Sequence, residues 1–243
     1  MNIIVSDIDQ IIVSLTDLPE LVNLGCANKY FHNLVSRQPI MNQWLFIKKK
    51  YPPAWDANTV FIEVCRSSFL SYAMFLIREN KIDIHAKDES AFRYSCANGH
   101  IEIAHWLIHL GESENYNKIN IHTDNEYAFQ CSCINGHIEM ARWLIKLGES
   151  ENYSKINIHA NNEFAFQHSC QIGHIEMAHW LIRFGESSDY NKIDIHAYNE
   201  HAFRLSCING HSEIAHWLIQ LGESESYNKI NPLVISGYIK ELN

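Results

Sequence analysis

The stretch GHIEIAHWLI at residues 99–108 decides how the chain is interpreted, because it occurs four times. It returns as GHIEMARWLI at 136–145, GHIEMAHWLI at 173–182 and GHSEIAHWLI at 210–219, each copy 37 residues after the one before. A regular spacing of this length is typical of repeat arrays, in which each unit buries its apolar face against its neighbours. The chain is therefore expected to fold as a stack of similar units.

The histidines of this stretch look like part of a zinc-protease helix. In that motif two histidines four residues apart share one helical face, whereas His100 and His105 are five apart and lie about 140° from each other around a helix. The second copy has Arg142 in place of the later histidine. A zinc site needs one convergence of three or four ligands, so the pattern predicts no metal site. Walker, Rossmann and Ser-His-Asp signatures are also missing, which predicts no catalytic residue and no cofactor.

Two histidine columns leave alternatives open. One comprises His85, His122, His159 and His196, and the other His100, His137, His174 and His211. Either column is compatible with a pH sensor or a ladder of ligands. The favoured interpretation is a turn-stabilising hydrogen bond that recurs because the repeat recurs.

Charge and hydropathy exclude further classes of protein. The net charge is −9 at pH 7, and residues 81–228 hold ten basic and twenty acidic side chains. Nucleic acid is not an expected partner, because phosphate backbones require clustered Lys and Arg. The N-terminus lacks the pattern of a signal peptide, and no apolar run is long enough to span a membrane.

Four of the seven cysteines form another column: Cys96, Cys133, Cys170 and Cys207. Neighbouring repeats lie about 10 Å apart when helices pack, which is beyond the reach of a disulfide. The cysteines are therefore expected to be reduced thiols, which indicates a cytoplasmic or nuclear protein.

The repeat register divides most of the chain. Full repeats span 81–117, 118–154, 155–191 and 192–228, and a degenerate capping repeat without the Gly-His turn spans 60–80. After residue 228 the sequence begins another copy and diverges at Pro232, which predicts a C-terminal cap over 229–243.

Each repeat contains the signals of two helices. In the first full repeat they are ESAFRYSC at 89–96 and IEIAHWLIHL at 101–110, joined by an Asn-Gly turn at 98–99. Gly111 stands where a helix end favours a left-handed residue. The following ESENYNK segment at 112–118 is polar and turn-forming, so it is expected to be an exposed loop.

Comparison of the copies separates two faces of the first helix. Ala91, Phe92, Ser95 and Cys96 recur in every full repeat, which predicts a packed face. Four columns that begin at residues 87, 90, 94 and 97 vary between copies and predict an exposed, partner-binding face. The residues expected to bind a partner there are Ser90, Tyr94, Tyr127, Ile134, Phe164, His168, Tyr198, His201 and Leu205. The alternative for these columns is that they vary because they are unconstrained, solvent-facing positions. The acidic loops could also dock a partner, although the favoured interpretation is that they form a solvating edge.

This pattern resembles the ankyrin repeat over about residues 60–228. In AFRYSCANGHIEIAHWLIHLG at 91–111, the family's Leu, Ala-Ala, Gly-His and Leu triplet correspond to Phe92, Ser95-Cys96, Gly99-His100 and Trp106-Leu107-Ile108. The family's Thr-Pro-Leu-His opening is replaced by SAFR, and the preceding hairpin is shorter, which predicts a tight turn instead. The resemblance implies an all-α, helix-turn-helix solenoid that binds proteins, with the first helices on its concave surface.

The first fifty residues resemble an F-box over about 3–46. The matching segments are Ile11–Leu15, Glu20–Leu24, Ala27–Phe31 and Trp44, although Ile3-Ile4 stand where the family has Leu-Pro. The resemblance implies a small helical domain over 1–50, a linker over 51–59, and contact with a Skp-family adaptor. The residues expected to make that contact are Ile3, Ile4, Leu15, Leu21 and Leu24.

Two functions follow from these resemblances. The favoured one is a substrate-recruiting adaptor of a cullin-type ubiquitin ligase, acting as a monomer. The alternative is a non-catalytic ankyrin scaffold or inhibitor whose N-terminus is a structural cap. The Ile-, Asn- and His-rich repeats also resemble arrays of amoebae and their giant DNA viruses, which implies action inside a host cell.

Overall fold

The computed structural model describes residues 56–79, 81–113, 116–187, 189–224 and 226–238, and the regular structure of these residues is entirely helical. The helices form five helix-turn-helix pairs: α5 (Ala57–Arg66) with α6 (Leu70–Glu79), α7 (Ala86–Ala97) with α8 (Ile101–Gly111), α9 (Thr123–Ile134) with α10 (Ile138–Gly148), α11 (Ala160–Ile172) with α12 (Ile175–Ser187), and α13 (Ala197–Ile208) with α14 (Ser212–Gly222). A short helix, α15 (Pro232–Gly237), follows the last pair. The prediction of an all-α solenoid is confirmed.

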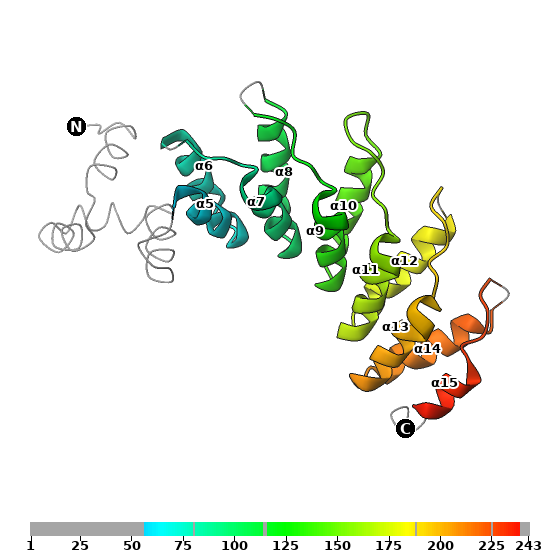
Figure 1. Ribbon diagram of the computed structural model, residues 1–243. Coiled ribbons are helices and arrows are strands. Elements are labelled where there is room, and N and C mark those ends of the chain that lie inside the picture. Colours follow the sequence, from blue (N-terminus) through cyan, green and yellow to red (C-terminus); the bar gives the residue numbers. More distant parts are fainter. Residues whose placement is uncertain (1–55, 80, 114–115, 188, 225, 239–243) are drawn as a thin grey trace, which may run out of the picture.

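The pairs stand side by side in a curved array, with the first helix of each pair on the inner side of the arc (Figure 1). Neighbouring first helices contact one another directly, from α5 to α7 and on to α13. Their packed face consists of small residues such as Ala91 and Cys96, which let the helix backbones approach, and of the fully buried Phe92. These are the residues that recur in every copy, so repetition marks the contacts that hold the stack together.

The recurring serine of the first helix also links neighbouring repeats. The Ser132 hydroxyl donates to the Ala128 carbonyl at 2.7 Å and lies 3.1 Å from the carbonyl oxygen of Cys96 in the preceding repeat. Ser169 and Ser206 make the same contacts with the cysteines before them. A buried hydroxyl is costly without a partner, and here the neighbouring helix supplies one.

The Gly-His turn explains why glycine recurs between the two helices. Gly99, Gly136, Gly173 and Gly210 all have positive φ, as the sequence predicted for a turn. A Cβ on Gly99 would also lie 2.7 Å from the Nδ1 atom of His137, which belongs to the next repeat. Glycine is therefore required here both for its backbone conformation and for close packing between repeats.

Gly111 differs from the expectation of a left-handed helix end. Its φ is not positive, and it is the last residue of α8. A Cβ at this position would lie 2.9 Å from the Asn117 carbonyl oxygen, because the loop turns back against the helix end. Gly148 and Gly222 are in the same situation. These glycines make room for the returning loop.

Each full repeat opens with a tight turn, and no strand is found in the described part of the chain. In the first repeat the Asp83 carboxylate accepts from the His85 N–H at 3.0 Å, which closes the turn. The next residues, Lys87 to Glu89, adopt left-handed φ values between 54° and 61° before the right-handed helix begins. The same three positions are left-handed in the other three full repeats. The predicted reduction of the hairpin to a tight turn is confirmed.

A histidine and a glutamate join each of these turns to the next repeat. Nδ1 of His159 donates to the buried carboxylate of Glu163 at 2.7 Å, and the same carboxylate oxygen accepts from the Asp194 N–H at 3.1 Å. The arrangement recurs in every full repeat, from Glu89 to Glu200. The first histidine column therefore stabilises the turn, as favoured from the sequence, and the glutamate extends that bond between repeats.

The start of the array differs in detail from the predicted boundary. Helix α5 starts at Ala57, with Asp56 as its N-cap, so the last residues of the predicted linker over 51–59 are helical. At the other end, α15 begins at Pro232, where the repeat sequence diverges, because Asn231 caps the helix and proline is favoured in a first turn.

Candidate functional site

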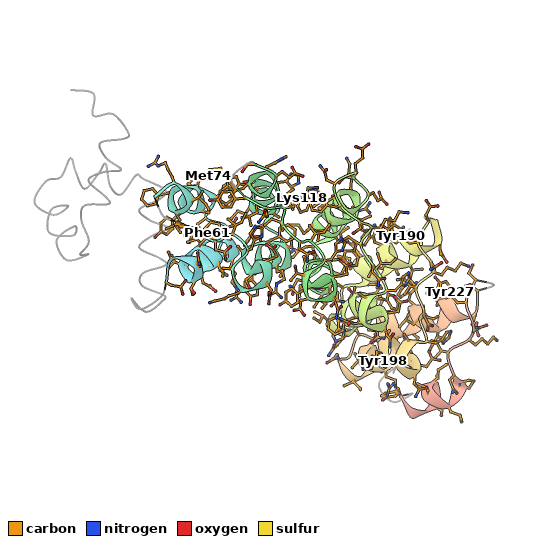
Figure 2. The ribbon with its side chains drawn as sticks, turned by 45° about the horizontal axis from the view of Figure 1, so that its top comes forward. Phe61, Met74, Lys118, Tyr190, Tyr198 and Tyr227 are labelled. Atoms are coloured by element: carbon orange, nitrogen blue, oxygen red, sulfur yellow. The ribbon has the colours of Figure 1, made fainter. Side chains whose placement is uncertain are left out.

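The inner face of the first helices carries most of the residues predicted to bind a partner. Tyr198 on α13 is 60% exposed, and it lies on the side of the array away from the loop residues Tyr190 and Tyr227 (Figure 2). Seven others are half-buried: Tyr94, Tyr127, Ile134, Phe164, His168, His201 and Leu205. We call these positions, together with the rest of the varying columns, the variable face.

Ser90 is the exception, and the expectation that it is exposed is wrong. It is 3% exposed, and its hydroxyl donates to the Lys87 carbonyl at 2.6 Å within the left-handed turn. A serine at this position is too short to extend beyond the turn. The larger Tyr127, Phe164 and His201 occupy the same column and reach the surface.

A groove of about 560 Å³ lies on the variable face between α11 and α13. Four of the predicted residues line it: Phe164, His168, Tyr198 and His201. Asn161, Gln167 and Arg204 complete its lining. Two neighbouring repeats therefore combine aromatic, polar and basic side chains in one concave site, which is the usual form of a binding pocket.

The two imidazoles of the groove are held in defined orientations. Nδ1 of His168 donates to the Phe164 carbonyl at 3.0 Å, and its ring lies 3.8 Å from the Phe164 ring. Nδ1 of His201 donates to the Gln167 amide oxygen at 2.9 Å, while the Gln167 amide group donates to the Asn162 carbonyl. Burial, assisted by the nearby Arg204, lowers the pKa of His201. Each ring therefore turns its Nε2 away from these bonds.

The other end of the variable face is covered by arginines. The guanidinium of Arg66 lies 4.9 Å from the centre of the Tyr94 ring, and that of Arg93 lies at the same distance from Tyr127. Arg93 also donates to the Asp124 carboxylate at 2.9 Å. Burial raises the pKa of Tyr127 to about 12, with a smaller contribution from its hydrogen bond to Cys131. This end is closed by contacts within the chain.

The long loops are less uniformly exposed than the sequence suggested. Tyr153, Tyr190 and Tyr227 are half-buried, and each ring lies within 6 Å of the ammonium of the lysine that begins the same repeat. Burial raises the pKa of Tyr153 to about 12, with the nearby Glu112 adding to the effect. Lysines also approach the loop acids, as in the Lys155–Asp189 pair at 3.8 Å. The loop edge is thus a stacked ladder of mixed charge.

The histidines of the opening motif serve the contacts between repeats. Nε2 of His100 lies 2.9 Å from the Arg66 carbonyl oxygen, and the His105 ring stacks on Trp143 of the next repeat at 4.4 Å. Trp143 in turn lies 6.4 Å from Phe92, and Trp217 repeats the contact with Phe166. The described residues include no group of three or more potential ligands that could hold a metal ion.

The predicted adaptor contacts lie outside the described residues. These are Ile3, Ile4, Leu15, Leu21 and Leu24 in the F-box-like segment. Within the described ranges, none of the helices has the length and apolar character needed to cross a membrane.

Sequence reasoning missed one column of the groove. Position 93 recurs as Gln130, Gln167 and Arg204, so its column alternates between arginine and glutamine and varies less than the columns that were selected. Its members connect first helices, because Arg93 reaches Asp124 and Gln167 reaches His201. The alternation of only two residue types in this column was a weak signal beside the more variable columns.

Comparison with known protein families supports the repeat assignment. Residues 133–231 match the family model described as ankyrin repeats, in three copies. A comparison with curated proteins found no match. The chain carries ankyrin repeats over this stretch, and the preceding pairs α5–α6 and α7–α8 continue the same stack of helices.

Proposed function

We propose that these ankyrin repeats bind a partner protein through the variable face, with the groove between α11 and α13 at the centre of the contact. Ankyrin repeats are protein–protein interaction modules, which gives the general function. The observation that supports the site is the convergence of Phe164, His168, Tyr198 and His201 from two repeats on one groove. The chain acts by binding, and no catalytic step is proposed.

The chemistry of the groove suits a protein partner. Tyr198 leaves a large ring exposed where no contact with the core requires it, and Phe164 and His168 form a second ring pair beside it. Aromatic side chains at the centre of an interface commonly provide most of its binding energy. Exposed apolar patches on a stable monomer also tend to mark contacts.

The test is capture of partners by proximity labelling with the full chain, followed by the double substitution Phe164→Ala with Tyr198→Ala. We expect the purified double variant to keep its helical circular dichroism and to lose the captured partner. A matched control replaces Met74 and Leu233 by alanine, since both are exposed, at 45% and 81%, but lie at the two ends of the array. Equal capture by wild type and the groove variant would refute the proposed site.

We further propose that this binding module recruits substrates to a cullin-type ubiquitin ligase. The support is the F-box-like pattern over residues 3–46, with its apolar Leu15, Leu21 and Leu24. Co-precipitation of the full chain with a Skp-family adaptor tests the role, and replacement of these three leucines by serine should abolish it. Absence of adaptor binding by the wild-type chain would favour a scaffold or inhibitor whose first fifty residues form a cap.

A further inference from the structure

We infer that the α11–α13 groove takes an acidic peptide segment of the partner, with a carboxylate on Arg204 and a neighbouring apolar side chain against Tyr198 and Phe164. This inference rests on the proposed function, because it assigns a ligand chemistry to the same groove. It is carried by the contrast between Arg204 and the other members of its column.

Arg93 and Arg204 occupy equivalent positions and begin with the same contact. Nη2 of Arg93 donates to the Lys87 carbonyl at 3.1 Å, and Nη2 of Arg204 donates to the corresponding Tyr198 carbonyl at 3.0 Å. Nη1 of Arg93 then donates to the Asp124 carboxylate in the next repeat. The repeat register places Ile235 where Asp124 stands, and Nη1 of Arg204 has no acceptor among the described residues.

The two intermediate members of the column are also paired with the next repeat. The Gln130 amide oxygen accepts from the Asn161 amide at 3.4 Å, and that of Gln167 accepts from His201. Arg204 belongs to the last full repeat, and the described residues that follow it supply no carboxylate for it. An acidic side chain of a partner would restore the pairing that Arg93 makes within the chain, since guanidinium groups bind carboxylates in a matching planar geometry.

The local charge favours the same ligand. The chain carries a net charge of −9, yet Arg204 is the charged side chain in the lining of the groove, which includes no carboxylate. The nearest acids in sequence, Glu163 and Glu200, are buried and already bonded to His159 and His196. An anionic ligand therefore meets a basic site on an otherwise acidic array.

The remaining lining suits an apolar neighbour of that carboxylate. Tyr198 and Phe164 offer ring surface on two sides of the groove, and the outward Nε2 atoms of His168 and His201 can bond to peptide groups. The volume of about 560 Å³ is within the range of sites that hold a few side chains. A single guanidinium matches one carboxylate, whereas phosphate sites usually gather several cations or backbone N–H groups.

The test selects phage-displayed random peptides on the full chain and measures the affinity of the enriched peptides by fluorescence polarisation. We expect the enriched sequences to share an Asp or Glu beside an aromatic or branched apolar residue. Arg204→Gln should weaken their binding about tenfold, the effect of losing one charge-assisted pair. Arg93→Gln is the matched control and should bind as wild type. Both substitutions are expected to fold, because glutamine is the native residue at positions 130 and 167.

A second measurement changes the peptide and leaves the protein intact. Replacing the Asp or Glu of the peptide by Asn or Gln should weaken its binding to the wild-type chain about as much as Arg204→Gln weakens binding of the original peptide. The altered peptide should bind the Arg204→Gln variant only slightly more weakly than it binds wild type. One outcome would overturn the acidic assignment but keep the groove as the binding site for the partner protein. In that outcome the enriched peptides lack an acid, and their binding is lost with Tyr198→Ala but kept with Arg204→Gln. Peptides insensitive to both variants, or no enrichment at all, would overturn the groove itself. Competition by millimolar inorganic phosphate equal to that of the peptide would assign the site to a phosphate instead.

Discussion

Phe164 and Phe166 lie two residues apart on α11, and they show how differently the two faces of one helix are used. Phe166 is fully buried, and Phe92, Phe129 and Phe203 repeat it in the other full copies. Phe164 lines the open groove, and its column contains serine, tyrosine and histidine in the other copies. Residues that recur form the buried core between repeats, whereas residues that differ lie at the surface of the first helices, where some of them also contact the next repeat.

The largest expected effect is the loss of a recurring core ring. Phe166→Ala should lower the free energy of unfolding by about 3–5 kcal/mol, because it leaves a cavity between repeats. Phe164→Ala should cost about 1 kcal/mol or less, since the ring is half-buried and packs mainly on His168. Urea unfolding followed by circular dichroism compares the two. Equal shifts of the unfolding midpoint would contradict the division between the faces.

The bond between a turn and the next repeat should have the next largest effect. Glu163→Ala removes the acceptor of both His159 and the Asp194 N–H, and leaves polar groups buried without a partner. We expect a loss of about 2–3 kcal/mol in the free energy of unfolding. Glu176→Ala, an exposed acid on α12, is the control and should change stability by less than about 0.5 kcal/mol. A small effect of the first substitution would show that the glutamate is dispensable between repeats.

Two equivalent glycines separate backbone strain from packing between repeats. Gly173 and Gly210 both have positive φ, but an alanine Cβ at Gly173 would lie 2.6 Å from the His211 ring, while nothing lies within 4 Å of one at Gly210. Gly210→Ala should cost about 1 kcal/mol for the backbone alone. Gly173→Ala should cost about 2 kcal/mol or more, because the histidine must also move. Thermal melts of both variants provide the measurement, and identical midpoints would mean that the repeats adjust freely.

The smallest expected effect is a pair of opposite pH dependences. The hydrogen bond to Glu163 raises the pKa of His159, so its stabilisation is present below the ordinary imidazole pKa of about 6.5 and is lost as the pH rises through the raised value. Burial lowers the pKa of His137, so its contribution is present above about 6.5 and is lost as the pH falls. His159→Gln should therefore destabilise most at low pH, and His137→Gln most at high pH. Urea unfolding at pH 5 to 8 measures the change, and the free energy of unfolding lost by each variant should vary with pH by less than about 1 kcal/mol. The same direction of pH dependence in both variants would contradict the opposite pKa shifts of His159 and His137.

Much of the fold could be predicted because the chain repeats. The constant positions Phe92, Ser95 and Cys96 and the turn at Gly99 follow from periodicity and turn chemistry, and the structure places them as expected. The role of Gly111 could not be predicted, because it depends on the Asn117 carbonyl returning against the helix end. Such a contact between backbone segments leaves no periodic signal.

The candidate site could be predicted in part for the same reason. Variation between copies selected Phe164, His168, Tyr198 and His201, which share the groove. It also selected Ser90, because column variation does not reveal that a short side chain remains buried. Arg204 was missed because its role depends on a difference between repeats. Arg93 pairs with Asp124, whereas the described residues after Arg204 have Ile235 at the corresponding position. Recognising this difference requires both the repeat register and the contacts of Arg93.

The separation between the two faces is tested most directly by hydroxyl-radical footprinting of the full chain, free and bound to its captured partner. We expect oxidation of Tyr198 and Phe164 to slow on binding, because both line the groove. Tyr153 and Tyr190 in the loop ladder, and Trp143 between repeats, should react at unchanged rates. Protection of the loop tyrosines together with unchanged oxidation of Tyr198 would contradict binding through the variable face and place the partner on the acidic loop edge.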